Sequence, residues 1–409
     1  MTTPHLPAHA THATQPLRPD RPLRHEEGAC LPLRSRHGQC RACADACPTG
    51  ALSVAVGAVA LSEACVGCGR CTAACPTQAL SLPELLALPE PVPGDDMRTP
   101  PLRVECRKVP AERLEAGALV LPCTGALTAG RLLAQAAAGR AVQVVDRGWC
   151  VGCEAGCSER QPAHPAAAAL DSAQAWLDAL QDPADPVAPV AVSLVHEPLP
   201  LHLRPQAIPP APVAAPPVDR RRFFRAALEK PAGRDRANPS PMGSDGRPAY
   251  PADERHPSPE RARQHAALQR LAGADGGVVP AEFYPRLHAD ASCCDRRMCV
   301  ALCPTAALTV AEDGATAGLR FDPVACIACG TCVRACPEGS LALTAHGGAA
   351  EPQALATHQR LRCADCGDAF SVAAASTDSP PPQSRLCPAC SKSRRFIDDA
   401  RRQLFGALN

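Results

Sequence analysis

The chain has 409 residues, which is enough for two to four domains. Its formal net charge is +1 at pH 7, so the charge gives no argument for binding nucleic acid or an anionic membrane surface. Aromatic residues make up 3% and prolines number 46, so we expect few large cores, extended connections and some other means of holding small units together.

The 25 cysteines can hold such small units together in place of large hydrophobic cores. Nearly all of them occur at C-x2-C or C-x3-C spacings, which are typical of metal ligands and not of a disulfide scaffold. Such thiolates need a reducing compartment. The N-terminal region has no apolar h-region, and no apolar run approaches the ~20 residues of a membrane span. The sequence therefore predicts a soluble cytoplasmic protein.

The N-terminal part of the chain changes character near residue 28. Residues 1–27 are rich in Pro, His and Arg and are predicted to be disordered. Residues 28–85 hold eight cysteines in two similar halves, and residues 51–64 between the halves read as strand, turn and strand. The second half follows the spacing C-x2-C-x2-C-x3-C-P without deviation, and its cysteines are Cys65, Cys68, Cys71 and Cys75.

The first half of this segment departs from the regular spacing. Cys47, Cys43 and Cys40 fall where they are expected, but His37 stands where the first cysteine belongs. The remaining thiol, Cys30, lies seven residues earlier. Either Cys30 or His37 can fill the missing position.

These runs resemble the bacterial two-cluster [4Fe–4S] ferredoxins. The resemblance implies that three cysteines of one half share a cluster with the pre-proline cysteine of the other half. One cluster would use Cys47, Cys65, Cys68 and Cys71. The other would use Cys40, Cys43, Cys75 and one more ligand, for which we favour Cys30 over His37 because thiolate is the usual ligand and a longer loop can deliver it.

The middle segment, residues 100–182, contains three apolar runs that end near Cys106, Cys123 and Cys150. A helical stretch lies between the second and third runs and ends at Gly139. This β-α-β pattern predicts parallel strands, and ligands gather beyond the carboxyl ends of such strands. We therefore expect a set of cysteines to converge there, namely Cys106, Cys123, Cys150, Cys153 and, as a further candidate, Cys157.

Two short motifs of this segment, PCTG at 122–125 and WCVGCEAGC at 149–157, resemble the small iron–sulfur subunit of methyl-viologen-reducing hydrogenases. The expectation is a metal centre within residues 100–160, either iron–sulfur or zinc, held by Cys106, Cys123, Cys150 and Cys153. A redox-active thiol pair and buried structural cysteines are the alternatives.

A second eight-cysteine segment follows a long linker. The linker, 183–285, is dominated by Pro, Ala and Arg, and the second segment covers 286–346. Its second half is regular and resembles the same ferredoxins, while 307–325 read as strand, turn and strand. The implied ligands of one cluster are Cys303, Cys326, Cys329 and Cys332, and Cys336 precedes Pro337.

The other cluster of this segment has an irregular ligand set. Cys299 and Cys336 are regular, but Arg296 stands where a cysteine belongs. Cys293, Cys294 or both would complete the site. A [3Fe–4S] cluster, a strained [4Fe–4S] cluster and the absence of a cluster are all open.

The tail, residues 360–392, carries two C-x2-C pairs separated by twenty residues. Its cysteines are Cys363, Cys366, Cys387 and Cys390. This spacing is typical of a zinc ribbon, with rubredoxin-type iron as the alternative. A closed four-cysteine zinc site leaves no open position for chemistry, so its role would be structural or in docking.

The sequence therefore predicts an α+β protein in which two ferredoxin-like domains flank a small α/β cysteine-rich domain, with a C-terminal zinc ribbon and long Pro-rich linkers. Up to four [4Fe–4S] clusters would be bound, with a [3Fe–4S] cluster as the alternative at one site, together with one zinc. We expect an electron-transfer protein that relays single electrons to or from a partner oxidoreductase such as a formate dehydrogenase or hydrogenase.

Catalysis by this chain alone is not expected, since no nucleophile–base constellation, phosphate loop or flavin fingerprint is present. A nucleic-acid partner is not expected either. The alternative function is an accessory protein for the maturation of a metalloenzyme, with structural or regulatory clusters.

Overall fold

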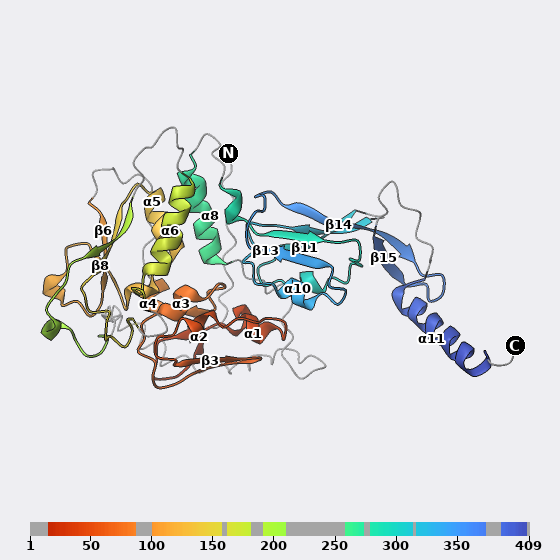
Figure 1. The fold of residues 1–409 in the computed structure, drawn as a ribbon, viewed down its shortest axis with the longest axis horizontal. Coiled ribbons are helices and arrows are strands. Elements are labelled where there is room, and N and C mark those ends of the chain that lie inside the picture. The colour runs from red at the N-terminus through yellow and green to blue at the C-terminus, as the bar shows by residue number, and fades with distance from the viewer. Residues whose placement is uncertain are drawn as a thin grey trace, which may run out of the picture. The chain divides into compact units, whose positions relative to one another are not determined.

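The structure is a computed structural model that describes residues 15–86, 100–157, 162–180, 191–209, 258–273, 279–313, 316–373 and 386–406 (Figure 1). The chain forms two compact units, which are described separately here. The first unit comprises 1–36 and 40–278, and the second comprises 37–39 and 279–409. Both units mix helices and strands, in agreement with the predicted fold class.

The first cysteine-rich segment is built on two small antiparallel sheets. One sheet joins β1 (Gln15–Pro16), β2 (Arg24–His25) and β5 (Leu80–Ser81). The other is the hairpin of β3 (Leu52–Ala55) and β4 (Ala58–Leu61), which the sequence predicts. The short helices are η1 (Glu27–Ala29), α1 (Leu31–Arg34), α2 (Ala42–Asp45), α3 (Arg70–Ala74) and α4 (Pro83–Leu86).

Part of the predicted disordered N-terminus belongs to this fold. Strand β2 lies within residues 15–27 and pairs antiparallel with β5, so His25 stands opposite Leu80. Leu23 is buried in the same core as Leu52 and Leu61. The structure therefore differs from the prediction for residues 15–27, while residues 1–14 lie outside the described part.

The middle segment forms the predicted parallel sheet. Its strand order is β7–β6–β8–β9, and all three pairings are parallel. The strands are β6 (Leu102–Cys106), β7 (Leu119–Leu121), β8 (Val142–Asp146) and β9 (Val192–His196). The helices are η2 (Ala111–Arg113), η3 (Thr124–Ala126), α5 (Ala129–Ala137), α6 (Ala167–Ala179) and η4 (Leu201–Leu203).

Helix α5 shows how the local sequence sets the β-α-β connection. Thr128 caps its first turn, with Oγ1 accepting a hydrogen bond from the Arg131 N–H. Gly139 follows the helix with φ +80°, a conformation that glycine adopts without steric cost. Buried leucines of α5, Leu132 and Leu133, face the protein interior. The chain can therefore reverse and enter β8 beside β6.

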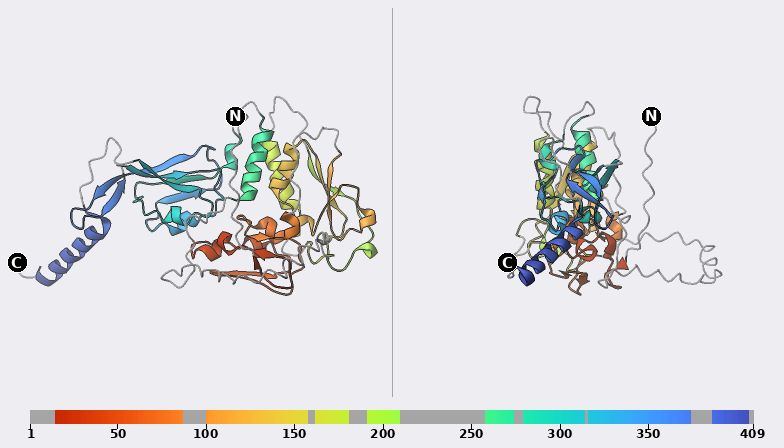
Figure 2. Two further views of the ribbon diagram at one scale, coloured as in Figure 1. Left: turned by 180° about the vertical axis from the view of Figure 1, so that it is seen from behind. Right: turned by 90° about the vertical axis from the view of Figure 1, so that its right-hand side faces the viewer.

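The segment predicted to be a linker, 183–285, contains two of the elements that build the first unit. Strand β9 adds the last strand to the parallel sheet. Helix α8 (Pro259–Leu271) packs beside α5, and α5, α6 and α8 stand side by side in both views (Figures 1 and 2). The predicted linker is therefore too long at both ends. Its central part, 210–257, lies outside the described residues.

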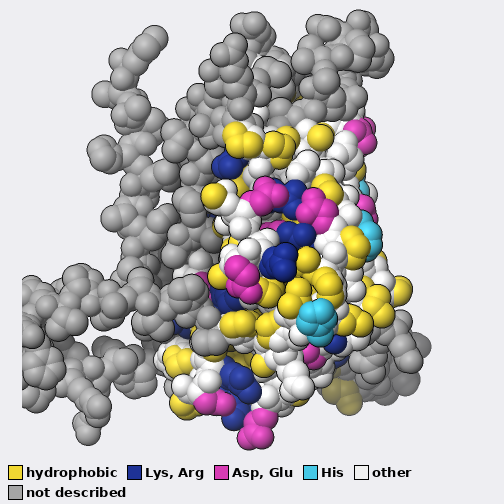
Figure 3. All heavy atoms as spheres, turned by 90° about the vertical axis from the view of Figure 1, so that its left-hand side faces the viewer, with side chains coloured by type: hydrophobic (Ala, Val, Ile, Leu, Met, Phe, Trp, Pro, Cys, Tyr) yellow, Lys and Arg dark blue, Asp and Glu magenta, His cyan; other side chains and the backbone are white. Residues whose placement is uncertain are grey.

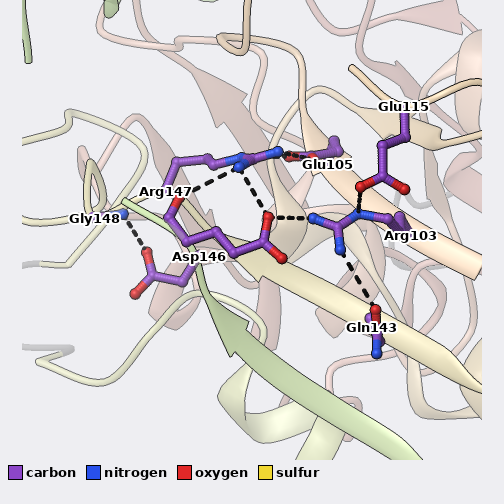
Figure 4. Close-up of polar contacts among 8 residues, drawn as sticks. Arg103, Glu105, Glu115, Gln143, Asp146, Arg147 and Gly148 are labelled. Carbon is purple, nitrogen blue, oxygen red and sulfur yellow. Dashed lines mark hydrogen bonds and ion pairs between the residues drawn. The ribbon is translucent and has the colours of Figure 1, made fainter. Parts of the chain in front are cut away.

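Ion pairs near the carboxyl ends of the parallel strands join β6 and β8 to the end of β9 (Figure 4). The guanidinium of Arg147 donates to Glu105, which has 0% of its side chain exposed, and to Glu197 at 3.1 Å. Arg103 binds Glu197 as well, and it lies 3.1 Å from Glu115. A carboxylate as deeply buried as Glu105 is tolerated only when it is paired, so this network fixes Arg147 in place.

The second unit contains a two-stranded and a four-stranded antiparallel sheet. Strand β10 (Arg286–Ala289) pairs with β13 (Leu341–Thr344). The larger sheet has the order β11–β12–β14–β15, with β11 (Leu308–Asp313), β12 (Thr316–Phe321), β14 (Gln353–Arg362) and β15 (Ala369–Ala373). The helices are η5 (Ala281–Phe283), α9 (Met298–Ala301), α10 (Thr331–Ala335) and α11 (Pro388–Phe405).

The four-cysteine tail is continuous with the second cysteine-rich segment. Strand β14 pairs with β12 of the predicted hairpin, and β15 extends the same sheet. The tail therefore shares a sheet with the preceding segment, whereas the sequence treats 360–392 as separate. Helix α11 begins at the second C-x2-C pair, where Cys387 is the N-cap. In the described part of the chain, no helix has the length and apolar character needed to cross a membrane.

Candidate iron–sulfur and metal sites

The regular site of the first segment is a small cavity between the two sheets. Its walls include Cys47, Cys65, Cys68 and Cys71, together with Leu52, Leu61 and Leu82. Gly67 and Gly69 adopt φ values of +67° and +81° between these cysteines, which lets short loops wrap the cavity. Burial acts to raise the pKa of Cys47, but hydrogen bonds from Thr49 and from the Ala51 N–H outweigh it and lower the pKa. Such N–H groups stabilise sulfur that carries negative charge.

The irregular site of this segment is a second cavity, and it contains Cys30. Cys30 lines it together with Cys40, Cys43 and Cys75. The residues between Cys30 and Cys40 include α1, for which Cys30 is the N-cap. His37 is not among the described residues that line this cavity. Burial raises the pKa of Cys30 to about 12, so this thiol ionises only beside a compensating cation.

The predicted convergence of cysteines in the middle segment is present. Cys106, Cys123, Cys150 and Cys153 line one cavity at the carboxyl ends of β6, β7 and β8. Cys157, the further candidate, does not line it, and its thiol donates to the Ala163 carbonyl at 3.4 Å. The remaining walls include Lys108, Arg147, Trp149 and His164.

Burial opposes the ionisation of three thiols of this cavity. Burial raises the pKa of Cys106 to about 11 and that of Cys123 to about 12, and it also raises the pKa of Cys150. A reactive thiol pair needs a lowered pKa, because the thiolate is the nucleophile. For these three thiols, burial therefore disfavours the thiolate form that a redox-active pair requires.

His164 is a member of this cavity that the sequence does not reveal. One ring nitrogen, one Asp146 oxygen and the Cys150 sulfur lie within 4.8 Å of one another. The Nδ1 atom accepts a hydrogen bond from the Ala166 N–H at 3.3 Å, and Nε2 is buried with no hydrogen-bond partner among the described residues. A lone histidine in a Pro- and Ala-rich run carries no spacing signal, so the sequence could not mark it.

Shared apolar clusters connect the three cysteine cavities of the first unit. Cys43 of the irregular site and Cys71 of the regular site pack around the same core. Cys68 of the regular site is buried together with Cys123 of the middle cavity. Arg70 secures this second junction, because its Nη1 donates to the Gly156 carbonyl at 2.9 Å.

The second unit has one regular and one irregular site. In the regular site, Cys332 is a close neighbour of Cys303, Cys326 and Cys329, and burial raises its pKa to about 12. The irregular cavity is lined by Cys293, Cys294, Cys299 and Cys336, and also by Asp295, Arg296 and Arg297.

The four cysteines of the tail differ from the other sites in their spacing. The sulfurs of Cys363, Cys366, Cys387 and Cys390 lie within 4.8 Å of one another, and those of Cys366 and Cys387 are 3.8 Å apart. A tetrahedral ion with bonds of about 2.3 Å places its sulfurs about 3.8 Å apart. Within the described ranges, no three cysteines of the ferredoxin-like segments are this close. The tail thus fits a single ion, whereas the cysteines of the ferredoxin-like segments are spaced more widely.

Comparison with known families agrees with this division. The family described as the 4Fe-4S dicluster domain matches residues 38–79 and, again, residues 291–340. The predicted ferredoxin resemblance is thereby confirmed for both cysteine-rich segments, and iron–sulfur domains of this kind suggest electron transfer. The family does not extend over the middle segment or the tail, so the hydrogenase resemblance and the zinc ribbon stay predictions. No curated protein matches the chain.

Proposed function

We propose that the protein relays single electrons through a series of iron–sulfur clusters to or from a partner oxidoreductase. The observation that carries this proposal is the contiguity of three cysteine cavities in the first unit, joined by Cys43 and Cys71 and then by Cys68 and Cys123. Centres that share core contacts suit electron hopping. Metal sites with purely structural roles do not need to lie next to one another, whereas electron-transfer centres do.

The ferredoxin-like domains would hold four clusters. The regular ones use Cys47, Cys65, Cys68 and Cys71 in the first unit, and Cys303, Cys326, Cys329 and Cys332 in the second. The irregular ones use Cys30, Cys40, Cys43 and Cys75, and Cys293, Cys299 and Cys336 with one further ligand. A bound cluster supplies one-electron chemistry, and the chain sets its potential through burial and hydrogen bonds to sulfur.

The middle cavity would hold a third centre of the first unit, ligated by Cys106, Cys123, Cys150 and Cys153. Its raised thiol pKa values favour a metal centre over a reactive thiol pair. The ammonium group of Lys108, a residue that lines the cavity, is buried and paired with Glu154 at 2.9 Å.

Zinc is the ion that best suits the tail, because four thiolates at tetrahedral spacing form a closed structural site. The ribbon would then order the start of α11. The partner would be a cytoplasmic enzyme of the formate dehydrogenase or hydrogenase class, a proposal supported by the resemblance at residues 122–125 and 149–157.

Anaerobic purification with iron and zinc quantitation tests the cofactor content. The ferredoxin-like domains should contain about 16 iron atoms per chain, and the tail about one zinc. A total near 8 iron atoms would mean that the irregular clusters do not assemble. Clusters that assemble but resist reduction, in a chain that binds an apo-enzyme, would favour the accessory function instead.

A further inference from the structure

The irregular site of the second unit contains a buried carboxylate of which only one oxygen accepts hydrogen bonds from described residues. Asp295 has 1% of its side chain exposed. Its Oδ2 atom accepts hydrogen bonds from Ser371 Oγ at 3.0 Å and from Arg297 Nη2 at 3.2 Å. Its Oδ1 atom is buried and has no hydrogen-bond partner in the described part of the chain. A buried carboxylate oxygen without a partner is costly, so a missing group is expected beside it.

The cysteines around Asp295 indicate that the missing group is a metal cluster. The residue lines the same cavity as Cys293, Cys299 and Cys336, the three thiols that the ferredoxin pattern places at this site. Asp295 has φ +53°, in the left-handed region, which aspartate enters more readily than most residues other than glycine.

The competing thiol, Cys294, is engaged elsewhere. It is hydrogen-bonded to Glu338 and Arg296, which also bind each other at 2.8 Å. Binding of Cys294 to iron would break these contacts, whereas Oδ1 of Asp295 has no hydrogen bond to lose in the described part of the chain. Arg296, at the regular cysteine position, offers no lone pair to iron.

We propose that Asp295, through Oδ1, is the fourth protein ligand of a [4Fe–4S] cluster otherwise held by Cys293, Cys299 and Cys336. This rests on the proposed function, since it requires a cluster at this site. Carboxylate oxygen is a harder ligand than thiolate, so the iron at this corner is held less firmly than the other three. The site is therefore a cluster with one labile iron.

The test compares variants of the full chain under anaerobic conditions. Ferricyanide takes up the one electron that is released when a [4Fe–4S]2+ core loses Fe2+ and becomes [3Fe–4S]+, and EPR measures the rate at which the three-iron signal grows. Asp295→Asn should raise this rate about tenfold or more, because the amide is a poor ligand. Asp295→Cys should suppress the conversion by providing a thiolate. Cys294→Ser is the matched control and should behave as the wild type.

The regular cluster of the same domain reports whether each variant folds. Wild-type behaviour of Asp295→Asn, with accelerated iron loss in Cys294→Ser, would overturn the assignment and make Cys294 the ligand. A wild-type cluster that contains three irons before any oxidant is added would also overturn it. In both cases the electron-transfer proposal stands. A wild-type chain with no cluster at this site also contradicts the Asp295 assignment, but it leaves the relay through the first unit standing, whereas clusters of the first unit that cannot be reduced contradict the electron-transfer proposal itself.

Discussion

At the residue scale, Cys30 shows how a candidate ligand can lie outside the regular spacing. It lies seven residues before the position that His37 occupies, yet it lines a cavity with Cys40, Cys43 and Cys75. Helix α1 takes up the additional length between Cys30 and the later cysteines. The sequence could narrow the choice to two residues, and the placement of Cys30 favours the thiol.

Replacing Cys30 by serine should therefore abolish one cluster. We expect the loss of about four iron atoms per chain, because a serine hydroxyl binds a cubane poorly. His37→Ala is the matched control and should retain all iron. Anaerobic iron quantitation checks both variants, and a loss of iron in His37→Ala with full iron in Cys30→Ser would identify the histidine as the ligand.

Glu105 offers a second test at this scale. Its carboxylate is fully buried and paired with Arg147, so Glu105→Ala leaves that largely buried guanidinium with Glu197 as its remaining carboxylate. The expected loss is about 1–3 kcal/mol of unfolding free energy, because a buried charged donor loses its buried acceptor. Glu115→Ala, which removes a carboxylate that is 61% exposed, should cost only about 0–1 kcal/mol. Urea unfolding followed by circular dichroism compares the two, and equal losses would contradict the role given to Glu105.

At the element scale, α8 is held to the rest of the first unit by its first turn. Glu260 accepts from Thr128 Oγ1 at 2.9 Å and from the Gly130 N–H at 2.7 Å, at the beginning of α5. Ser258, the N-cap of α8, donates to the Pro76 carbonyl at 2.8 Å. A helix from the Pro-rich region thus connects the ferredoxin-like segment with the parallel sheet.

Glu260→Ala should loosen α8. Removing a charged acceptor from two buried donors is expected to destabilise the contact by about 1–3 kcal/mol. Limited proteolysis should then cut within 258–273 faster than in the wild type. Asp171→Asn on the exposed side of α6 is the control. Unchanged cleavage in Glu260→Ala would show that other contacts hold the helix.

The tail provides a pH-dependent prediction. Hydrogen bonds from the N–H groups of Cys387 and Cys366 lower the pKa of Cys363 to about 6, whereas Cys390, hydrogen-bonded to Cys387, has a raised pKa. Cys363 is therefore already a thiolate at pH 7.5 and releases no proton when zinc binds, although it does so below about pH 6. Rebinding of zinc to the chelator-stripped tail of the full chain should release at most three protons at pH 7.5, as measured with an indicator dye. Release of four protons would contradict the preformed thiolate.

The elements that could be predicted are those with a strong local pattern. The hairpin at residues 51–64 has a glycine turn between alternating strands, and the β-α-β unit has a capped helix between apolar runs. Strand β9 could not be found because proline-rich stretches flank its five residues. Helix α8 buries only Ala267 and Leu268, so its polar sequence shows no apolar stripe. Asp295 was missed because its role depends on tertiary contacts with Ser371 and Arg297.

At the scale of the whole molecule, the cysteine sites are the features on which the proposed electron transfer depends. Basic and acidic side chains are interspersed on the face of the first unit in Figure 3, in keeping with a net charge of +1. That face has no extended surface of one sign. What unites the molecule is a repeated iron–sulfur domain, with an additional cysteine cavity placed directly beside one copy.

A redox titration of the anaerobic full chain, followed by EPR, tests the electron relay. We expect several reversible one-electron reductions. Reduced clusters of the first unit should show magnetic coupling, because the contacts of Cys43 with Cys71 and of Cys68 with Cys123 connect their sites. Cys30→Ser should remove one of the coupled signals. Clusters that cannot be reduced, or that are reduced without any coupling, would contradict the electron relay.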